Sequence, residues 1–121
     1  LAHDFCVISL SDRLTPWEMI EKRLACAAMG DFCMAIYNPS SKGRPDYLQR
    51  AVRILLQNGK PEETVCGIVR NIGRDGQQSE ILTLRELENT QVDMFTTVYI
   101  GNKETKSMQN KMVTPRGYRT I

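Results

Sequence analysis

Short apolar runs alternate with amphipathic segments through the first half of the sequence. This alternation limits the possible folds more than any other feature. Apolar runs of strand length occupy residues 5–10, 32–37 and 64–69. In the two segments between them, apolar residues recur at the spacing of one helical face: Trp17, Ile20, Leu24, Leu48, Val52 and Leu55. Strands joined through helices of this length favour parallel neighbours with both sheet faces covered. The sequence therefore predicts an α/β domain with a mixed, mainly parallel sheet and flanking helices.

Capping signals predict where the helices begin. Thr15-Pro16-Trp17-Glu18 places a threonine before a helical proline and a glutamate three residues later, which is the pattern of a capping box. The same pattern at Thr83-Leu84-Arg85-Glu86 predicts a short helix that ends near Glu88. Pro45 and Asp46 open a helix that ends at Gly59.

The second half of the chain carries weaker signals. The turn sequence 73–76 and the run 79–82 predict a strand that returns antiparallel to the third one. Residues 96–100 form the last clear strand, because no periodicity supports an element after Gly101.

Composition gives no support for several classes of function. The chain has 121 residues, enough for one domain with a real core, and its net charge of +2 gives no support for nucleic-acid binding. No apolar run reaches the length of a membrane span, and the first residues are not expected to form a secretory signal. Four cysteines without a C-x-x-C pair favour buried, reduced thiols over disulfides. With His3 as the only histidine, neither a metal site nor a Ser-His-Asp triad is expected.

A ligand cleft is predicted where two strands end in polar residues. The second strand ends at Tyr37-Asn38 and the third at Arg70-Asn71, and ligands of open α/β sheets bind at the carboxyl ends of strands. Lys42 and Arg44 follow in a polar loop that could meet an anion. An ordinary connection with a solvated loop explains the same pattern equally well.

No catalytic residue can be assigned from spacing. Asp12 and Asp31 are conceivable acids or bases, and Asp31 fits a turn better. Trp17 could stack on a planar ligand, although an aromatic on the apolar face of a helix more often belongs to the core. The residues therefore point to binding more than to catalysis.

Motifs distributed along nearly the whole chain carry a resemblance to a known family. They follow one another in this order: His3-Asp4-Phe5-Cys6-Val7-Ile8-Ser9-Leu10-Ser11-Asp12, Leu14-Thr15-Pro16-Trp17-Glu18, Tyr37-Asn38-Pro39, Ser41-Lys42, Arg44-Pro45, Gly67-Ile68-Val69-Arg70-Asn71, Val92-Asp93-Met94 and Met112-Val113-Thr114-Pro115-Arg116-Gly117-Tyr118. Together they resemble the C-terminal half of the precorrin-3B C17-methyltransferases, which belong to the tetrapyrrole methylases of cobalamin biosynthesis.

The resemblance implies a two-domain methyltransferase that binds S-adenosylmethionine between its halves. Residues 1–121 would form the C-terminal domain, and the N-terminal Gly-rich domain would be absent from this chain. The cofactor-binding positions of the family match a group of strand-end residues: Tyr37, Asn38, Arg70, Asn71 and Thr97. The tetrapyrrole substrate, a precorrin, would meet Lys42, Arg44 and Arg116. The catalytic groups would come largely from the other half.

The activity implied is methyl transfer to C17 of precorrin-3B, or of its cobalt analogue, with ring contraction. The resemblance also implies a cytoplasmic homodimer, and the fragment alone is expected to be inactive. Two alternatives stay open: a tetrapyrrole C-methyltransferase acting at another carbon, and a non-catalytic ligand-binding or assembly module.

Overall fold

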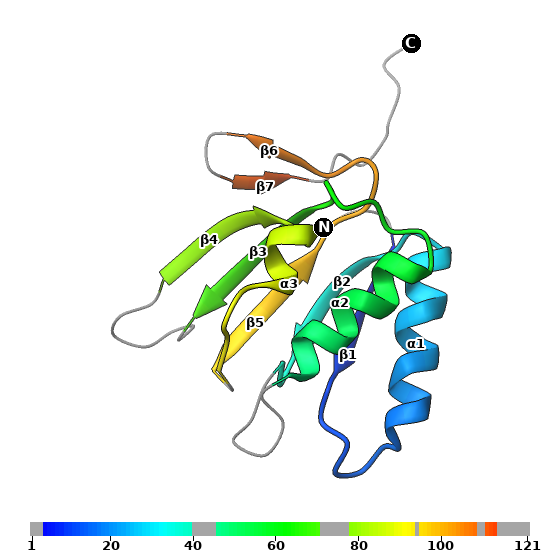
Figure 1. Cartoon of the computed structure of the whole chain (residues 1–121). Coiled ribbons are helices and arrows are strands. Elements are labelled where there is room, and N and C mark those ends of the chain that lie inside the picture. The colour runs from blue at the N-terminus through cyan, green and yellow to red at the C-terminus, as the bar shows by residue number, and fades with distance from the viewer. Residues whose placement is uncertain (1–3, 40–45, 71–77, 94, 109–110, 114–121) are drawn as a thin grey trace.

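The computed structural model describes residues 4–39, 46–70, 78–93, 95–108 and 111–113 (Figure 1). Its elements follow in this order: β1 (Phe5–Ser9), α1 (Trp17–Met29), β2 (Cys33–Tyr37), α2 (Tyr47–Gln57), β3 (Val65–Arg70), β4 (Gln78–Thr83), α3 (Leu84–Glu88), β5 (Thr96–Ile100), β6 (Lys106–Met108) and β7 (Lys111–Val113). The prediction of an α/β domain with a mixed sheet and flanking helices is confirmed.

The five main strands pair in the order β1-β2-β5-β3-β4, and this order corrects the prediction of a mainly parallel sheet. Only β1 and β2 are parallel neighbours, whereas β5 runs antiparallel to both β2 and β3. β2 and β3 therefore point the same way, as predicted, but they are not adjacent. β5 lies between them and pairs with both. The predicted antiparallel return of β4 along β3 is confirmed.

The core lies between one face of the sheet and the helices, which Figure 1 shows together on one side. Alternate residues of the strands join that core and are almost inaccessible to solvent: Ile8, Met34, Ile36, Cys66, Ile68, Val98 and Ile100. They pack with the apolar faces of the helices, among them Ile20, Leu24, Leu48, Val52, Leu55, Leu84 and Leu87. The remaining residues of each strand point to the opposite face.

The two predicted capping boxes have different outcomes. At α3, the Thr83 hydroxyl accepts from the Glu86 backbone N–H at 3.2 Å, and the Glu86 carboxylate accepts from the Thr83 N–H at 2.9 Å, so this box is confirmed. At α1 the prediction is wrong, because Pro16 occupies the N-cap position and no side chain caps the helix. The sequence pattern assigns Pro16 to the first helical position, but in the structure it lies one position earlier, at the N-cap.

The β6–β7 hairpin was not predicted. It is a two-stranded antiparallel sheet, and its Met112 sulfur lies against Gly67 of β3, 3.5 Å from where a Cβ would stand. Since Gly67 lies between two core-facing residues of β3, the hairpin contacts the sheet face opposite the helices. Each strand has three residues, too few for alternation to be read from sequence.

All four cysteines are free in the structure. Cys33 and Cys66 are buried, Cys6 is partly buried and Cys26 is exposed, so burial holds for only part of the set. Burial raises the pKa of the Cys66 thiol to about 12, which keeps it protonated at neutral pH.

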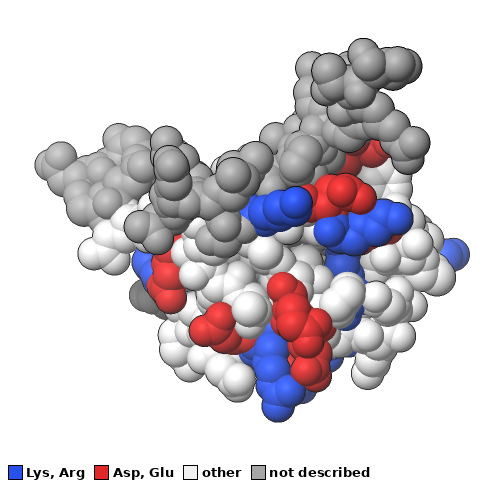
Figure 2. Space-filling model, turned by 90° about the horizontal axis from the view of Figure 1, so that it is seen from above, with Lys and Arg blue, Asp and Glu red and all other residues white. Residues whose placement is uncertain are grey.

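Charges of both signs lie intermixed on the molecular surface seen from above (Figure 2). On this face the described residues form no continuous patch of one sign, in keeping with the small net charge. Among the described helices, none is long and apolar enough to cross a membrane.

Candidate functional site

The register of the sheet brings the predicted strand ends to one edge. Ile36 of β2 and Ile68 of β3 both lie opposite Val98 of β5. Tyr37 and Arg70, which end β2 and β3, are therefore at the same end of the sheet, beside the beginning of β5. The prediction that two strands deliver polar residues to a shared edge is confirmed.

The side chains at this edge lie on different faces of the sheet. Tyr37 and Thr97 alternate with the core residues Ile36 and Val98, so they point away from the helices. Arg70 follows the alternation of Ile68 and points to the helix-covered face.

The Arg70 guanidinium is already engaged on its own face. Its Nη2 donates to the carbonyl oxygen of Gln91 at 3.1 Å, and its Nη1 lies 3.7 Å from a Glu80 carboxylate oxygen. The edge therefore offers two surfaces, one on each side of the sheet.

Asn38 is the residue that gives the edge its local shape. Its backbone has a positive φ of 53°, a conformation that asparagine tolerates better than most residues, and the chain turns there directly after β2. Its side-chain Nδ2 donates to Ser9 Oγ at 2.8 Å. This bond joins the ends of the neighbouring strands β1 and β2.

We call Ser9, Tyr37 and Asn38 the strand-end wall. All three residues are exposed, and Tyr37 is 43% accessible. An exposed aromatic ring beside hydroxyl and amide groups can stack on a planar group and form hydrogen bonds to it. Thr97, which was also predicted and points to the same face, is only 6% exposed and lies behind the accessible surface.

Ser9 is a member of this wall that the sequence analysis missed. The signal was present, because strand alternation in residues 5–10 places Ser9 on the face away from the apolar residues Ile8 and Leu10. Its role depends on the pairing of β1 with β2, which puts it in register with Tyr37.

A second cluster lies where the loop after β1 meets the start of α2. The Tyr47 hydroxyl donates to Asp12 Oδ2 at 2.5 Å, and the Tyr47 ring stacks on Trp17 with centroids 4.4 Å apart. The Arg50 guanidinium lies 4.7 Å from the Trp17 ring centroid, within cation–π range. Trp17 packs against the core, which agrees with its interpretation as a core aromatic. Asp12 is thus bonded to a tyrosine that the sequence analysis did not single out.

Several predicted site residues lie outside the described part of the chain: Asn71, Lys42, Arg44 and Arg116. Their assignments stay predictions.

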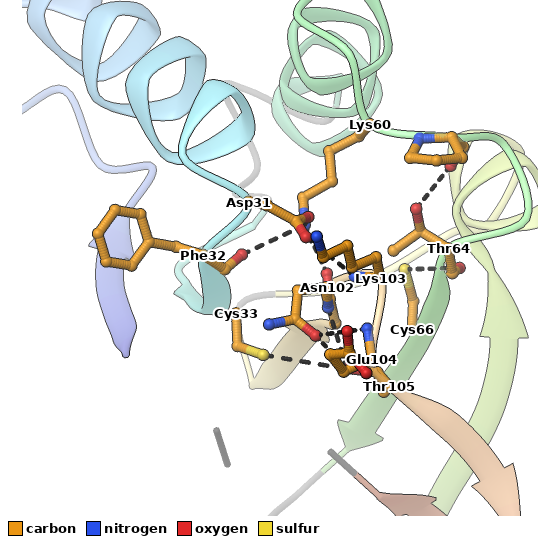
Figure 3. A network of polar contacts seen from close by, with 12 residues as sticks. Asp31, Phe32, Cys33, Lys60, Thr64, Cys66, Asn102, Lys103, Glu104 and Thr105 are labelled. Carbon is orange, nitrogen blue, oxygen red and sulfur yellow. Dashed lines mark hydrogen bonds and ion pairs between the residues drawn. The ribbon is translucent and has the colours of Figure 1, made fainter. Parts of the chain in front are cut away.

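The most connected polar network in the described residues lies at the other end of the sheet (Figure 3). Lys60, in the loop after α2, is buried, and its Nζ donates to Asp31 Oδ1 at 3.0 Å, Phe32 O at 3.3 Å and Gly101 O at 2.6 Å. The second Asp31 oxygen accepts from the Lys103 N–H at 3.1 Å.

This network joins the start of β2 to the end of β5. Asp31 has a positive φ of 53° in the turn between α1 and β2, which confirms its interpretation as a turn residue. β5 runs antiparallel to β2, so its end lies beside the start of β2, at the end of the sheet opposite the strand-end wall. The network therefore does not contribute to that wall.

The chain is similar to curated proteins over nearly its whole length. It is 48% identical over 118 residues to the cobalamin biosynthesis protein CbiHC of Archaeoglobus fulgidus, which it covers to 26%. It is 45% identical to a probable cobalt-factor III C(17)-methyltransferase of Salmonella typhimurium and 41% identical to the precorrin-3B C(17)-methyltransferase of a Sinorhizobium species. In each of these two cases the match covers 98% of this chain and 48% of the relative. The chain thus spans at most about half the length of these relatives, and no family model matches it.

Solved structures agree with the sequence comparisons. The crystal structure of the methyltransferase CobJ matches 93% of this chain and 47% of its own with a TM-score of 0.82 and 39% identity. The uroporphyrin-III C-methyl transferase of Thermus thermophilus, complexed with S-adenyl homocysteine, matches 84% of this chain and 41% of its own with a TM-score of 0.60. At 15% identity this second match speaks for the fold alone.

Proposed function

Since the chain belongs to the precorrin-3B and cobalt-factor III C17-methyltransferase family as a homologue of the C-terminal half of its members, we propose that it forms one wall of such an enzyme's active site. The whole enzyme transfers a methyl group from S-adenosylmethionine to C17 of precorrin-3B, or of its cobalt analogue, with ring contraction. The observation that carries this proposal is the match over 98% of the chain at 45% identity, together with a shared fold at a TM-score of 0.82.

The strand-end wall supports the proposed cofactor site. Tyr37 and Asn38 offer an exposed ring and an amide at the carboxyl end of β2, the position where ligands of open α/β sheets bind. S-adenosylmethionine supplies the methyl group from its sulfonium when bound. Methyl transfer requires mainly that two bound partners be held in line, so this half of the enzyme can contribute through positioning alone.

Other residues of the proposed site complete the arrangement. Arg70, Asn71 and Thr97 belong to the proposed cofactor contacts, and Arg70 reaches the cofactor only from the helix-covered face of the edge. Lys42, Arg44 and Arg116 would bind the carboxylates of the tetrapyrrole.

The proposal extends to the rest of the protein. The relatives are about twice as long as this chain, which supports a further domain N-terminal to it that completes the cofactor site. We propose a cytoplasmic homodimer for the whole enzyme, and this chain alone is expected to be inactive.

The decisive experiment is a calorimetric titration of S-adenosylhomocysteine into the full-length protein that carries this chain. Asn38→Gly keeps the positive φ, because glycine adopts it without strain, and removes only the amide side chain. We expect the affinity to fall about tenfold, equivalent to about 1.4 kcal/mol.

Asn89→Ala is the matched control, because Asn89 is an exposed asparagine at the end of α3, outside the strand-end wall. It should leave the affinity unchanged. Equal affinities for the wild type and Asn38→Gly would show that the wall does not bind the cofactor. A wild-type protein that binds no S-adenosylhomocysteine would contradict the methyltransferase proposal itself.

A further inference from the structure

An open pocket of about 540 Å³ lies beside the strand-end wall, at the free outer edge of β1. The end of β1, the loop that follows it and α1 line this pocket together. Asn38 and Ser9 belong both to the pocket and to the wall, so a ligand on the wall can extend into the pocket.

The charged side chains among the described residues that line the pocket are all positive. Among the described residues that line it, Arg13 from the loop and Arg23 from α1 are arginines, and none is acidic. Guanidinium groups bind carboxylates through paired, charge-assisted hydrogen bonds. Two such groups without a carboxylate among the lining residues favour an anionic ligand.

The hydroxyl groups of the pocket reinforce this preference. Ser9 Oγ accepts from Asn38 Nδ2 at 2.8 Å and from the Ser11 N–H at 3.3 Å. Both bonds use its oxygen lone pairs, so the hydroxyl hydrogen remains available as a donor. The Ser11 hydroxyl likewise accepts, from the Arg13 N–H at 3.5 Å. The pocket therefore presents donors and positive charge, while its serine acceptors are engaged within the protein.

We propose that this pocket is a carboxylate-binding subsite in which Arg13 and Arg23 supply the charge. The inference rests on the proposed function for the source of the carboxylate, which we assign to an acidic side chain of the tetrapyrrole. Val7 and Leu14 also line the pocket and can contact the methylene groups of such a side chain. The second source of the same chemistry is the amino-acid carboxylate of the cofactor, and the experiment separates the two.

The test compares the binding of two probes to the full-length protein: uroporphyrin III, a stable polycarboxylated tetrapyrrole, and S-adenosylhomocysteine. The variant Arg13→Gln combined with Arg23→Gln removes both charges. We expect it to bind uroporphyrin III about tenfold more weakly and S-adenosylhomocysteine with unchanged affinity. Added salt should weaken uroporphyrin binding by the wild type more than by the variant.

Lys22→Gln is the matched control, because Lys22 neighbours Arg23 on α1 but lies in a different groove beside Glu18 and Glu21. It removes the same charge from the same helix and should change neither affinity. This control separates the pocket from the general charge of the protein.

The possible results lead to distinct conclusions. Weaker binding of S-adenosylhomocysteine alone would keep the carboxylate subsite and assign it to the cofactor. If the wild type binds both probes and the double variant binds them equally well, the subsite proposal is overturned while the proposed function stands. If the wild type binds neither probe, both proposals are overturned.

Discussion

At the scale of single residues, the buried Lys60 tests how much a buried, fully hydrogen-bonded charge stabilises the fold. Its side chain is 1% exposed, and its ammonium group donates to three oxygens from two segments of the chain, residues 31–32 and Gly101. In Lys60→Met the side chain keeps a similar length, but the Phe32 and Gly101 carbonyl oxygens lose this donor. We expect the free energy of unfolding, measured in urea, to fall by about 2–4 kcal/mol.

Arg53→Met provides the comparison for this prediction. Arg53 also pairs with a carboxylate, that of Glu88 at 3.2 Å, but its side chain is 63% exposed. Solvent screens such a pair, so the expected loss is below about 0.5 kcal/mol. If the two variants lost similar free energies of unfolding, the burial of Lys60 would not increase the stability that its ion pair contributes.

Single residues also mark how far the sequence could predict the site. Tyr37 and Asn38 were found because an apolar run stops abruptly at a polar pair, and the structure places both at an exposed edge. The burial of Thr97 depends on which strands are neighbours, and so does the hydrogen bond from Arg70 to Gln91. No local pattern carries that information.

At the scale of elements, two threonines with similar sequence signals allow a direct test of helix capping. Thr83 caps α3 with a reciprocal pair of hydrogen bonds, whereas Thr15 makes no capping bond to α1. Thr83→Ala should therefore destabilise the chain by about 1 kcal/mol, and Thr15→Ala by much less. Thermal unfolding followed by circular dichroism measures both. A larger loss for Thr15→Ala would show that the proline is not the functional N-cap.

The elements themselves were largely predictable. Long amphipathic helices and apolar strands of five or six residues carry a periodicity that a single sequence displays, and β5 was predicted at residues 96–100 as observed. The β6–β7 hairpin was missed because its strands have three residues each and its packing depends on a contact between Met112 and Gly67. Short elements stabilised by distant contacts leave no local pattern.

At the scale of the whole molecule, the position of β5 determines how the two parts of the sheet are joined. β1 and β2 form one part and β3 and β4 the other, and among the described strands β5 alone pairs with both parts. Strands that follow one another in the sequence usually pair, so rules of connection can predict such pairs. No such rule predicts that a late strand inserts between two earlier ones. The sheet therefore requires the chain up to Ile100 before its halves are connected.

Val98 lies at the centre of this connection, fully buried and opposite both Ile36 and Ile68. Val98→Ala should lower the free energy of unfolding by about 2–3 kcal/mol, because it leaves a cavity between the two parts of the sheet. Trp17 is the only tryptophan, so its fluorescence reports on the α1 side, while far-UV circular dichroism reports on all elements. Both probes should shift to the same lower urea midpoint with an unchanged slope. Val7→Ala, on the exposed face of edge strand β1, should change the midpoint little. If Val98→Ala shifts the circular dichroism midpoint but not the fluorescence midpoint, the two parts of the sheet unfold independently and β5 does not couple them.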